Sequence, residues 1–433
     1  MKRVLFVSYY FPPSGGSGVQ RPLKFIKFLR SCGWDATVLT VNPEFASYSD
    51  LDESMADEIP EGVKIIRTRA RDPYAIYSKF TGRKKSDAVG VGFTDLGDIG
   101  IREKLARWVR GNVFIPDARV GWTKFAVRAA EKELAQTHYD AMITTGPPHS
   151  SHLIGSRIKK KTGLPWIIDL RDAWPSDSYG HLIPMSGLAS GWDSRLRGLA
   201  FQAADRIISV SKSIIRSTSK HTRTELELIP NGFDEDDFKH VVPIQHQGFS
   251  IVFTGHMPDE QNPDPLWKVI HEETANGNWP ELHVYLVGNV SRATLESIQD
   301  YGLEERVTLV SYVAHKEAIK WTCGADLLLL TINRVPNPDG IITGKLYEYL
   351  ASAKPVLCVG PPNGDAAEVI ASCSAGFTVD HHDNVAMKNV VGRFYDAWEA
   401  GTPIPGASEQ ASSQYSRRNQ AASLANILDQ ISS

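Results

Sequence analysis

Short apolar runs alternate with helical patterns along nearly the whole chain. Residues 4–7 predict a buried strand, and the Gly-rich turn 15–18 follows it. Apolar residues then recur at helical spacing over 19–29, Gly33 is placed to cap that helix, and residues 36–41 predict the next strand. This β-α-β order predicts parallel strands joined by a right-handed crossover.

The alternation continues, pauses once and restarts. Further strand-length runs occupy 63–67, 141–145, 166–170 and 206–210, then 251–254, 283–287, 307–310, 327–331 and 356–359. The pause is the polar stretch 234–247, and the last helical pattern is 423–431. We therefore expect an α/β fold of two doubly wound parallel-sheet domains facing across a cleft, with ligands at the carboxyl ends of the strands. The predicted parts are an N-terminal domain at 1–235, a C-terminal domain at 236–400, and a helical segment at 401–433 that could return to the N-terminal domain.

Residues 72–121 depart from this alternation of strand and helix patterns. They are rich in glycine and basic residues, including Arg83, Lys84 and Lys85, and residues 101–113 have the pattern of an amphipathic basic helix. Two interpretations stay open: an ordinary insertion with a solvated face, or an element that contacts a membrane surface or the acceptor.

Composition and charge exclude several classes of protein. A length of 433 residues fits two or three domains, and Lys+Arg 47 against Asp+Glu 50 gives a net charge of -3, so no overall basic excess indicates nucleic-acid binding. No apolar run reaches the roughly eighteen residues of a membrane span, and residues 4–7 are too short for a signal-peptide core. Four cysteines without C-x-x-C spacing predict buried free thiols, and hence a cytoplasmic protein. They are Cys32, Cys323, Cys358 and Cys373.

The glycine loop after the first strand is the first candidate for ligand contact. Glycine lets the backbone approach a ligand, and the N-terminus of the next helix favours an anion, although a plain tight turn is the alternative. A dinucleotide site needs G-x-G-x-x-G, but Arg21 stands where the third glycine belongs. Asn42 stands where the second strand should be followed by an acidic residue, so the dinucleotide interpretation fails.

The second candidate is residues 340–351, which follow a buried strand and open a helix. The pair Gly344-Lys345 is similar to a P-loop, but Asp339 replaces its first glycine and Leu346 its magnesium-binding hydroxyl residue. A helix N-terminus can still hold a diphosphate through its amides, with Lys345 as the cation. Glu348, one turn further, could accept two hydroxyl hydrogen bonds from a ribose; its alternative is a solvated helix glutamate.

These and other motifs resemble the large retaining glycosyltransferase family of the GT-B fold, which includes bacterial polysaccharide and phosphatidylinositol mannosyltransferases. The resemblance covers essentially the whole chain. Its motifs are SYYFPP at 8–13, ADRIISVS at 204–211, PNGFD at 230–234, FTG at 253–255 and GKLYEYLA at 344–351. A bacterial surface-polysaccharide branch of family 4-like enzymes is indicated by IPDARVGW at 115–122, TTGPPHSSH at 144–152 and DLRDAW at 169–174.

The resemblance implies two Rossmann-like domains and transfer of a sugar from a nucleotide-diphosphate donor to a hydroxyl acceptor, with retention and without a metal. The acceptor would be a glycan or a lipid-linked glycan, and peripheral contact with the inner face of the membrane through 72–121 is left open. The candidate catalytic contacts are Asp172, His149 and Arg171. The candidate donor-binding residues are Gly16, Gly18, Gly255, His256, Thr343, Gly344, Lys345, Leu346 and Glu348.

The chain departs from the family pattern at three places. Arg171 and Asp172 stand where a histidine usually touches the donor sugar. The family has a Glu-x7-Glu motif whose first glutamate contacts the sugar hydroxyls, and Gly340 stands at that position. Asp339 is the alternative carboxylate for this contact. The family's basic pair after the glycine of the second domain's first strand is absent, and Lys345 and Arg334 are the candidate substitutes.

Two further groups have competing interpretations. His149 and His152 lack the spacing of a zinc site; either they face the cleft, or one caps the next helix and the other packs within it. The Asp-x-Asp within 234–237 predicts a solvated loop with helix-capping aspartates, and not a metal-diphosphate site. Two other functions stay open: a nucleotide-sugar 2-epimerase on this fold, and a non-catalytic subunit of a polysaccharide-synthesis complex.

Overall fold

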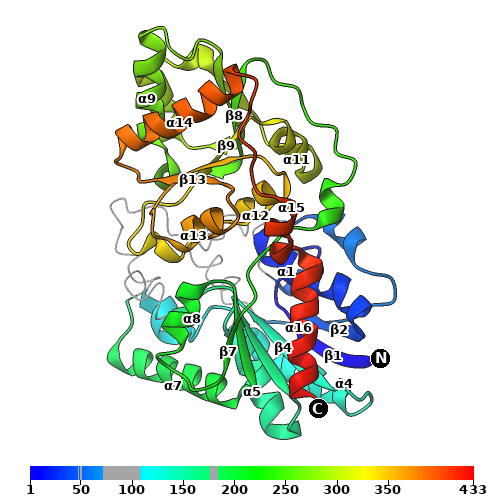
Figure 1. Cartoon of the computed structure of the whole chain (residues 1–433). Helices are drawn as coiled ribbons and strands as arrows, with labels where there is room; N and C mark the ends of the chain where they lie inside the picture. Colours follow the sequence, from blue (N-terminus) through cyan, green and yellow to red (C-terminus); the bar gives the residue numbers. More distant parts are fainter. Residues whose placement is uncertain (47, 49–50, 72–107, 176–183) are drawn as a thin grey trace. The chain divides into compact units, whose positions relative to one another are not determined.

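The computed structural model describes residues 1–46, 48, 51–71, 108–175 and 184–433. The predicted basic run at 83–85, and most of the insertion at 72–121, lie outside these residues. The described chain divides into two compact units, one of residues 1–230 with 420–433 and one of residues 231–419. Each unit is a parallel sheet with helices on both faces (Figure 1), which confirms the predicted α/β class.

The first unit has a seven-stranded sheet of order β3-β2-β1-β4-β5-β6-β7, parallel throughout. Its strands are β1 Lys2–Val7, β2 Trp34–Val41, β3 Lys64–Thr68, β4 Ala141–Gly146, β5 Trp166–Leu170, β6 Arg206–Ser209 and β7 Leu226–Leu228. Its helices are α1 Ser17–Leu29, α4 Thr123–Leu134, α5 Ser150–Thr162, α7 Gly187–Ala203, α8 Lys212–Thr218 and most of α16 Arg417–Ile431. The strand order reverses between β1 and β4, which is the switch point where such sheets bind ligands.

The central strand β1 is buried on both faces, which explains its unbroken apolar run. Val4 and Phe6 pack in a core with residues of α1 and α16. Leu5 and Val7 point to the opposite core, which residues of α4, α5 and α7 complete. Period-two alternation along a strand therefore distributes its side chains between two helical layers.

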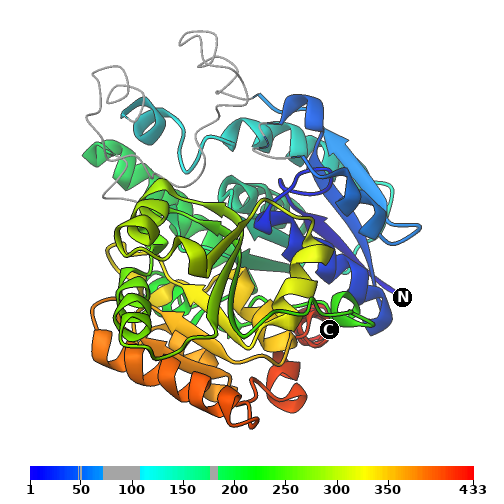
Figure 2. The ribbon, with the colours of Figure 1, turned by 90° about the horizontal axis from the view of Figure 1, so that it is seen from above.

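The second unit has a six-stranded sheet of order β10-β9-β8-β11-β12-β13. Its strands are β8 Phe249–Met257, β9 Leu282–Val290, β10 Val307–Val310, β11 Leu327–Thr331, β12 Val356–Val359 and β13 Gly376–Val379. Its helices are α9 Asp264–Ala275, α10 Arg292–Asp300, α11 His315–Gly324, α12 Gly344–Ala351, α13 Asp365–Ser372, α14 Asn384–Glu399 and α15 Glu409–Ser412. Helices α9 and α14 lie side by side on one face (Figure 2), and α12 and α13 pack on the other. The switch point here lies between β8 and β11.

Several predicted elements need correction. Helix α16 begins at Arg417 and not at residue 423. The predicted start was too late because the first turn of the helix is polar and shows no apolar periodicity. Strands β7 and β13 were not predicted, since both are short and half-buried. All four cysteines are free, but Cys32 and Cys323 are only partly buried, at the end of a helical segment. In the described part of the chain, no helix is long and apolar enough to span a bilayer.

Candidate active site

Helix α12 begins at the switch point of the second unit and is fixed there by Tyr349. The Tyr349 hydroxyl accepts from the amide of Thr254 on β8 and donates to the carbonyl of Leu329 on β11, both at 3.3 Å. β8 and β11 pair only through residues 251–252 and 327–328, so the tyrosine joins the two strands where they diverge. Burial raises the pKa of Tyr349 to about 12, so it remains a neutral donor. The N-terminus of α12 is thereby held at the edge where ligands bind.

Lys345 places a cation at the carboxyl end of β8. Its Nζ donates to the carbonyl of His256 at 3.1 Å and lies 3.9 Å from the centre of the Phe253 ring. Burial lowers the pKa of Lys345 from 10.5 to about 7, against the opposing effect of the Glu348 carboxylate. The ammonium is therefore close to half-charged at neutral pH, and a nearby anion would favour its charged form.

Gly255 allows this approach of Lys345 to β8. Its φ is +103°, and a Cβ there would lie 2.8 Å from Cε of Lys345. It pairs with Gly288 on β9, where a Cβ would lie 2.2 Å from the Gly255 carbonyl oxygen. Both positions therefore require glycine, which explains the glycine of the FTG motif.

Thr343 precedes the first residue of α12 and makes no side-chain cap. Its Oγ1 is buried and has no hydrogen-bond partner among the described residues. This unpaired hydroxyl is on the residue before the amides of Gly344 and Lys345, which have no intrahelical acceptors, whereas the amide of Leu346 donates to the Thr343 carbonyl at 3.2 Å. Leu346 is fully buried in the core, so only its backbone could contact a ligand. A Cβ at Gly344 would meet nothing within 4 Å.

Glu348 lies on the second turn of α12 and is partly exposed. Its Oε1 is 3.0 Å from Nε2 of His315, the first residue of α11. Asp339 and Arg334, the predicted substitutes for family residues, are both exposed; Arg334 donates to the Asp259 carbonyl at 3.4 Å.

In the first unit, Arg171 joins the first turn of α1 to the end of β4 at the carboxyl edge of the sheet. Its guanidinium donates to the carbonyls of Gly18, Gly146 and Pro147. A Cβ at Gly18 would lie 3.2 Å from Arg171 Nη1, so this glycine makes room for the contact. Gly16, at φ +85°, is the residue before α1. Burial lowers the pKa of Arg171. Its N–H groups hold the backbone of α1 and of residues 146–147 together.

His149 and His152 lie in a buried aromatic group at the start of α5. His149 Nε2 donates to the Asp172 carbonyl at 3.3 Å, and its ring centre is 5.1 Å from that of Trp174. Burial lowers the pKa of both histidines, that of His152 well below its usual value. His152 Nδ1 is 2.8 Å from Thr144 Oγ1, so this histidine packs within the helix, as one interpretation predicted.

Asp117 caps α5, a role that the alternative interpretation gave to one of the histidines. Its carboxylate accepts from the amide and the hydroxyl of Ser150, at 2.7 and 2.9 Å. His149 occupies the cap position but makes no side-chain cap, and is instead held against Asp172. The carboxylate of Asp172 accepts no hydrogen bond from a described residue, so it is available to a ligand.

Solved structures were found that are similar along the whole chain. Sucrose-phosphate synthase of Thermosynechococcus elongatus is 14% identical, with a TM-score of 0.62 and 99% of each chain covered. HepE of Anabaena, solved with UDP and glucose, is 16% identical, with a TM-score of 0.62 and 99% and 100% covered. WaaG, a glycosyltransferase involved in lipopolysaccharide biosynthesis, is 13% identical, with a TM-score of 0.54 and 99% of each chain covered. At these identities the similarity shows the fold.

Two family models match the sequence itself. The model of glycosyltransferase family 4 matches residues 90–237, and the model of group 1 glycosyl transferases matches residues 248–397. The chain is a family 4-like glycosyltransferase of the GT-B fold. This confirms the family and fold indicated by the sequence motifs. No curated protein matches the sequence.

Some residues of this glycosyltransferase site were missed by the sequence analysis. Asp117 lies in the IPDARVGW motif and is of a type that caps helices, which could have indicated its role. His315 follows the predicted strand 307–310, at the end where ligands bind. Arg21 was noted only for replacing a glycine, but it forms a buried ion pair with Asp169.

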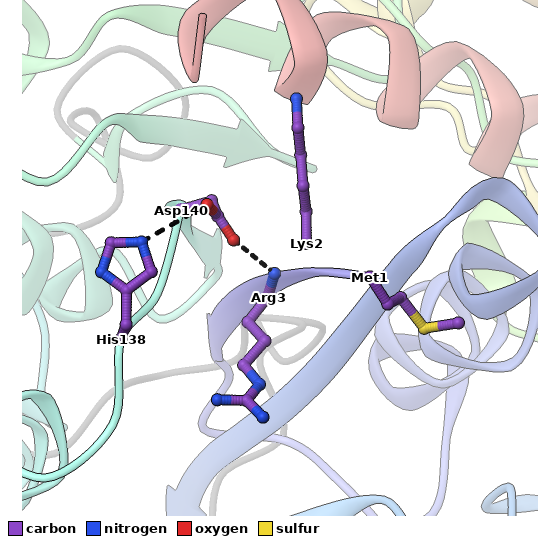
Figure 3. Close-up of a pocket in the computed structure, with 5 residues that line it drawn as sticks. All are labelled: Met1, Lys2, Arg3, His138 and Asp140. Atoms are coloured by element: carbon purple, nitrogen blue, oxygen red, sulfur yellow. Dashed lines mark hydrogen bonds and ion pairs between the residues drawn. The ribbon is translucent and has the colours of Figure 1, made fainter.

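Two other places are poorer candidates. A 310 Å³ pocket is lined by Met1, Lys2, Arg3, His138 and Asp140 (Figure 3). It lies at the amino ends of β1 and β4, and so at the edge of the sheet opposite the carboxyl ends where ligands bind. Asp234 accepts from the Asp236 amide and caps the short 3-10 helix Glu235–Phe238, as predicted for this acidic loop. Among the residues that the structure describes, no three His, Cys, Asp or Glu side chains are gathered for a metal ion.

Proposed function

We propose that the protein transfers a sugar from a nucleoside-diphosphate sugar to a hydroxyl group of an acceptor, with retention of the anomeric configuration. The observation that carries this proposal is the position of Lys345 beside the N-terminus of α12, at the carboxyl end of β8. A cation and a helix N-terminus at the switch point form a site for a diphosphate.

In such a reaction, negative charge builds on the departing diphosphate, and the protein must stabilise it. The Lys345 ammonium and the first amides of α12 would stabilise that charge, and the unpaired Thr343 hydroxyl would donate to a phosphate oxygen. Glu348 would accept hydrogen bonds from the ribose hydroxyls. Because these groups supply the required charge, we propose that the reaction needs no divalent metal.

The first unit would contribute contacts to the transferred sugar or the acceptor. Asp172 is the carboxylate available for this, and His149 holds its backbone. Arg171 would act by fixing the first turn of α1 to residues 146–147 at the end of β4, and not by touching the sugar, since each of its three side-chain nitrogens donates to a backbone carbonyl.

Two solved relatives support the substrate classes. HepE was solved with UDP and glucose, and WaaG is described as acting in lipopolysaccharide biosynthesis. We propose accordingly a nucleotide-sugar donor and a glycan or lipid-linked glycan acceptor. The four free cysteines favour the reducing cytoplasm as the place of the reaction.

Thermal unfolding in the presence of UDP, GDP, dTDP and CMP tests the donor site. A ligand at 100 times its Kd stabilises the folded state by about 2.7 kcal/mol, which raises Tm by a few degrees. We expect one nucleoside diphosphate to stabilise the wild type, and Glu348→Ala to lose about half of that shift or more, as a loss of affinity of about tenfold or more requires. Glu296→Ala on α10, an exposed glutamate paired with Arg292, is the matched control and should retain it.

Product analysis with the matching sugar nucleotide then tests the reaction. We expect transfer only when an acceptor is present, unchanged by EDTA, and a product whose anomeric configuration by NMR equals that of the donor. A new sugar nucleotide formed from the donor alone would establish an epimerase instead. A folded protein that no nucleotide stabilises would indicate a non-catalytic subunit.

A further inference from the structure

A buried carboxylate on α7 holds the indole of Trp174. Both carboxylate oxygens of Asp193 lie 3.0 Å from Trp174 Nε1, and each of the two residues is 1% exposed. Burial of a carboxylate costs free energy, and a neutral oxygen would be enough to accept from an indole N–H. A charged acceptor makes the hydrogen bond about twice as strong, so the pair fixes the tryptophan more firmly than satisfaction of its N–H requires.

Aromatic neighbours on two helices also hold the Trp174 ring. Its centre lies 5.5 Å from that of Phe201 on α7, in an edge-to-face contact at 86°. It lies 5.1 Å from the ring centre of His149, which precedes the first residue of α5. Asp193 and Phe201 are eight residues apart, so they share one side of α7, and both are buried. One side of α7 therefore fixes the tryptophan, and the tryptophan in turn supports His149.

Asp172 lies between two anchored residues. Before it, the Arg171 amide donates to the carbonyl of the last residue of β4 at 3.0 Å, and after it Trp174 is held by Asp193. His149, which packs on Trp174, donates to the Asp172 carbonyl at 3.3 Å. The backbone of Asp172 is thus fixed, while its carboxylate accepts no hydrogen bond from a described residue. A fixed backbone with an available carboxylate is what a preorganised contact with a ligand requires.

We propose that Asp193 and Trp174 are positioning residues, which hold Asp172 where its carboxylate meets the transferred sugar or the acceptor. Neither of them touches a substrate, because both are buried. The inference rests on the proposed transfer reaction and extends it to the contact between α7 and the segment after β5. Loss of this contact should slow the reaction and leave the proposed nucleotide site of the second unit unchanged.

Steady-state kinetics of the full chain tests the proposal, with the sugar nucleotide and acceptor that the product analysis identifies. Trp174→Phe keeps a ring but loses the N–H, and we expect kcat to fall about tenfold while KM for the donor changes less than twofold. Asp193→Leu should have the same effect. Asp193→Asn keeps an oxygen that can accept from the indole, so kcat should stay within about threefold of the wild type.

Combination with Asp172→Ala separates positioning from a purely structural role. Asp172→Ala should lower kcat about 100-fold. If Trp174 acts only through Asp172, adding Trp174→Phe to Asp172→Ala should lower kcat no further. Losses that multiply would overturn the proposal, because Trp174 would then act by another route, and a wild-type kcat in Asp172→Ala would overturn it as well.

A second variant guards against loss of the fold. Trp174→Phe takes this hydrogen bond from a buried carboxylate, whereas Trp174→Phe combined with Asp193→Leu removes both groups. The combined variant should be folded by circular dichroism, show the wild-type rise of Tm with the nucleoside diphosphate, and be as slow as Trp174→Phe.

Trp267→Phe on α9 is the matched control. The buried Trp267 indole donates to Asn262 Oδ1 at 2.8 Å, so its loss should destabilise the fold and leave kcat unchanged. An equal fall of kcat in this control would show that lost stability slows the enzyme and would overturn the positioning role. Equal kcat in the wild type and Trp174→Phe overturns this inference alone, whereas a wild type that transfers no sugar overturns the proposed function together with it.

Discussion

Nε2 of His315 lies 3.0 Å from Oε1 of Glu348 and so links the first residue of α11 to the second turn of α12. The two helices follow β10 and β11, which are not neighbours in the sheet. The contact therefore fixes a carboxylate that would otherwise rotate freely on a partly exposed helix surface. No described residue binds the second oxygen of Glu348, which leaves it available for a ribose hydroxyl.

We expect His315→Ala to weaken binding of the nucleotide by about twofold to fivefold, because an exposed pair contributes up to about 1 kcal/mol. Glu348→Ala should weaken it by about tenfold or more, since both hydrogen bonds to the ribose are lost. Isothermal titration calorimetry measures both effects, and steady-state kinetics should show the His315 effect in KM and not in kcat. His271→Ala, on α9, is the control; a larger loss in His315→Ala than in Glu348→Ala would contradict this positioning role.

The pKa of Lys345 predicts that nucleotide binding takes up a proton. Above a pKa of about 7 the free site is mostly neutral, whereas the diphosphate favours the ammonium. Affinity should fall by up to about tenfold per pH unit above pH 7, with close to one proton taken up at pH 8. Calorimetry in buffers of different ionisation enthalpy measures this uptake.

Variants of Lys345 separate its charge from its packing. In Lys345→Arg the guanidinium stays charged, so binding should show no proton uptake near pH 8. The stability of the wild type relative to Lys345→Met should rise between about pH 7 and 10.5, because the unfolded lysine then binds a proton that the folded one does not. Proton uptake that persists in Lys345→Met would assign the titration to another group.

Gly255→Ala should reduce both stability and nucleotide binding. A positive φ costs a non-glycine residue about 1–2 kcal/mol, and the new Cβ would displace Cε of Lys345. Gly277→Ala, at φ +80° with nothing within 4 Å of its Cβ, has the same strain without the displacement. Urea unfolding should therefore show losses of similar size, while nucleotide affinity falls only in Gly255→Ala. A loss of affinity in both variants would contradict the role assigned to Lys345.

The fold was largely predictable because buried parallel strands form unbroken apolar runs. The run 327–331 coincides with β11, and the run 141–145 lacks only Gly146 of β4. The prediction missed secondary-structure elements that form because of their position in the fold and not because of an apolar run in the sequence. Strand β7 exists because residues 226–228 pair with the edge of β6, although none of the three is buried.

The candidate site was predictable as a set of residue types but not as a set of contacts. Glycine at 255 and lysine at 345 could be noted as separate motifs, but only the structure shows that one makes room for the other. Arg171 was a candidate for sugar contact; its three backbone acceptors lie in α1 and at residues 146–147, far apart in the sequence, which no local spacing reveals. Burial likewise determines that His152 is a packed residue.

A buried ion pair supports the carboxyl edge of the first unit. Arg21 and Asp169 are almost fully buried; Arg21 Nη2 lies 2.9 Å from Asp169 Oδ1. Asp169 also accepts from the Thr145 hydroxyl at 2.8 Å, and Arg21 donates to the carbonyl of Pro230 at 2.7 Å. Pro230 is the last residue of the first unit before the chain enters the second, so the pair fixes that exit point.

Removal of either charge should leave the other buried and unpaired. Arg21→Met or Asp169→Asn should lower the free energy of unfolding by about 3–5 kcal/mol, because the remaining charge loses its partner but stays away from water. The double variant should recover part of that loss, since neither charge then remains. Lys2→Met, which removes the exposed pair with Asp429, should cost less than about 1 kcal/mol. Urea unfolding followed by circular dichroism measures all four; a single variant no less stable than Lys2→Met would show that water reaches the pair and that it does not fix the exit of the chain.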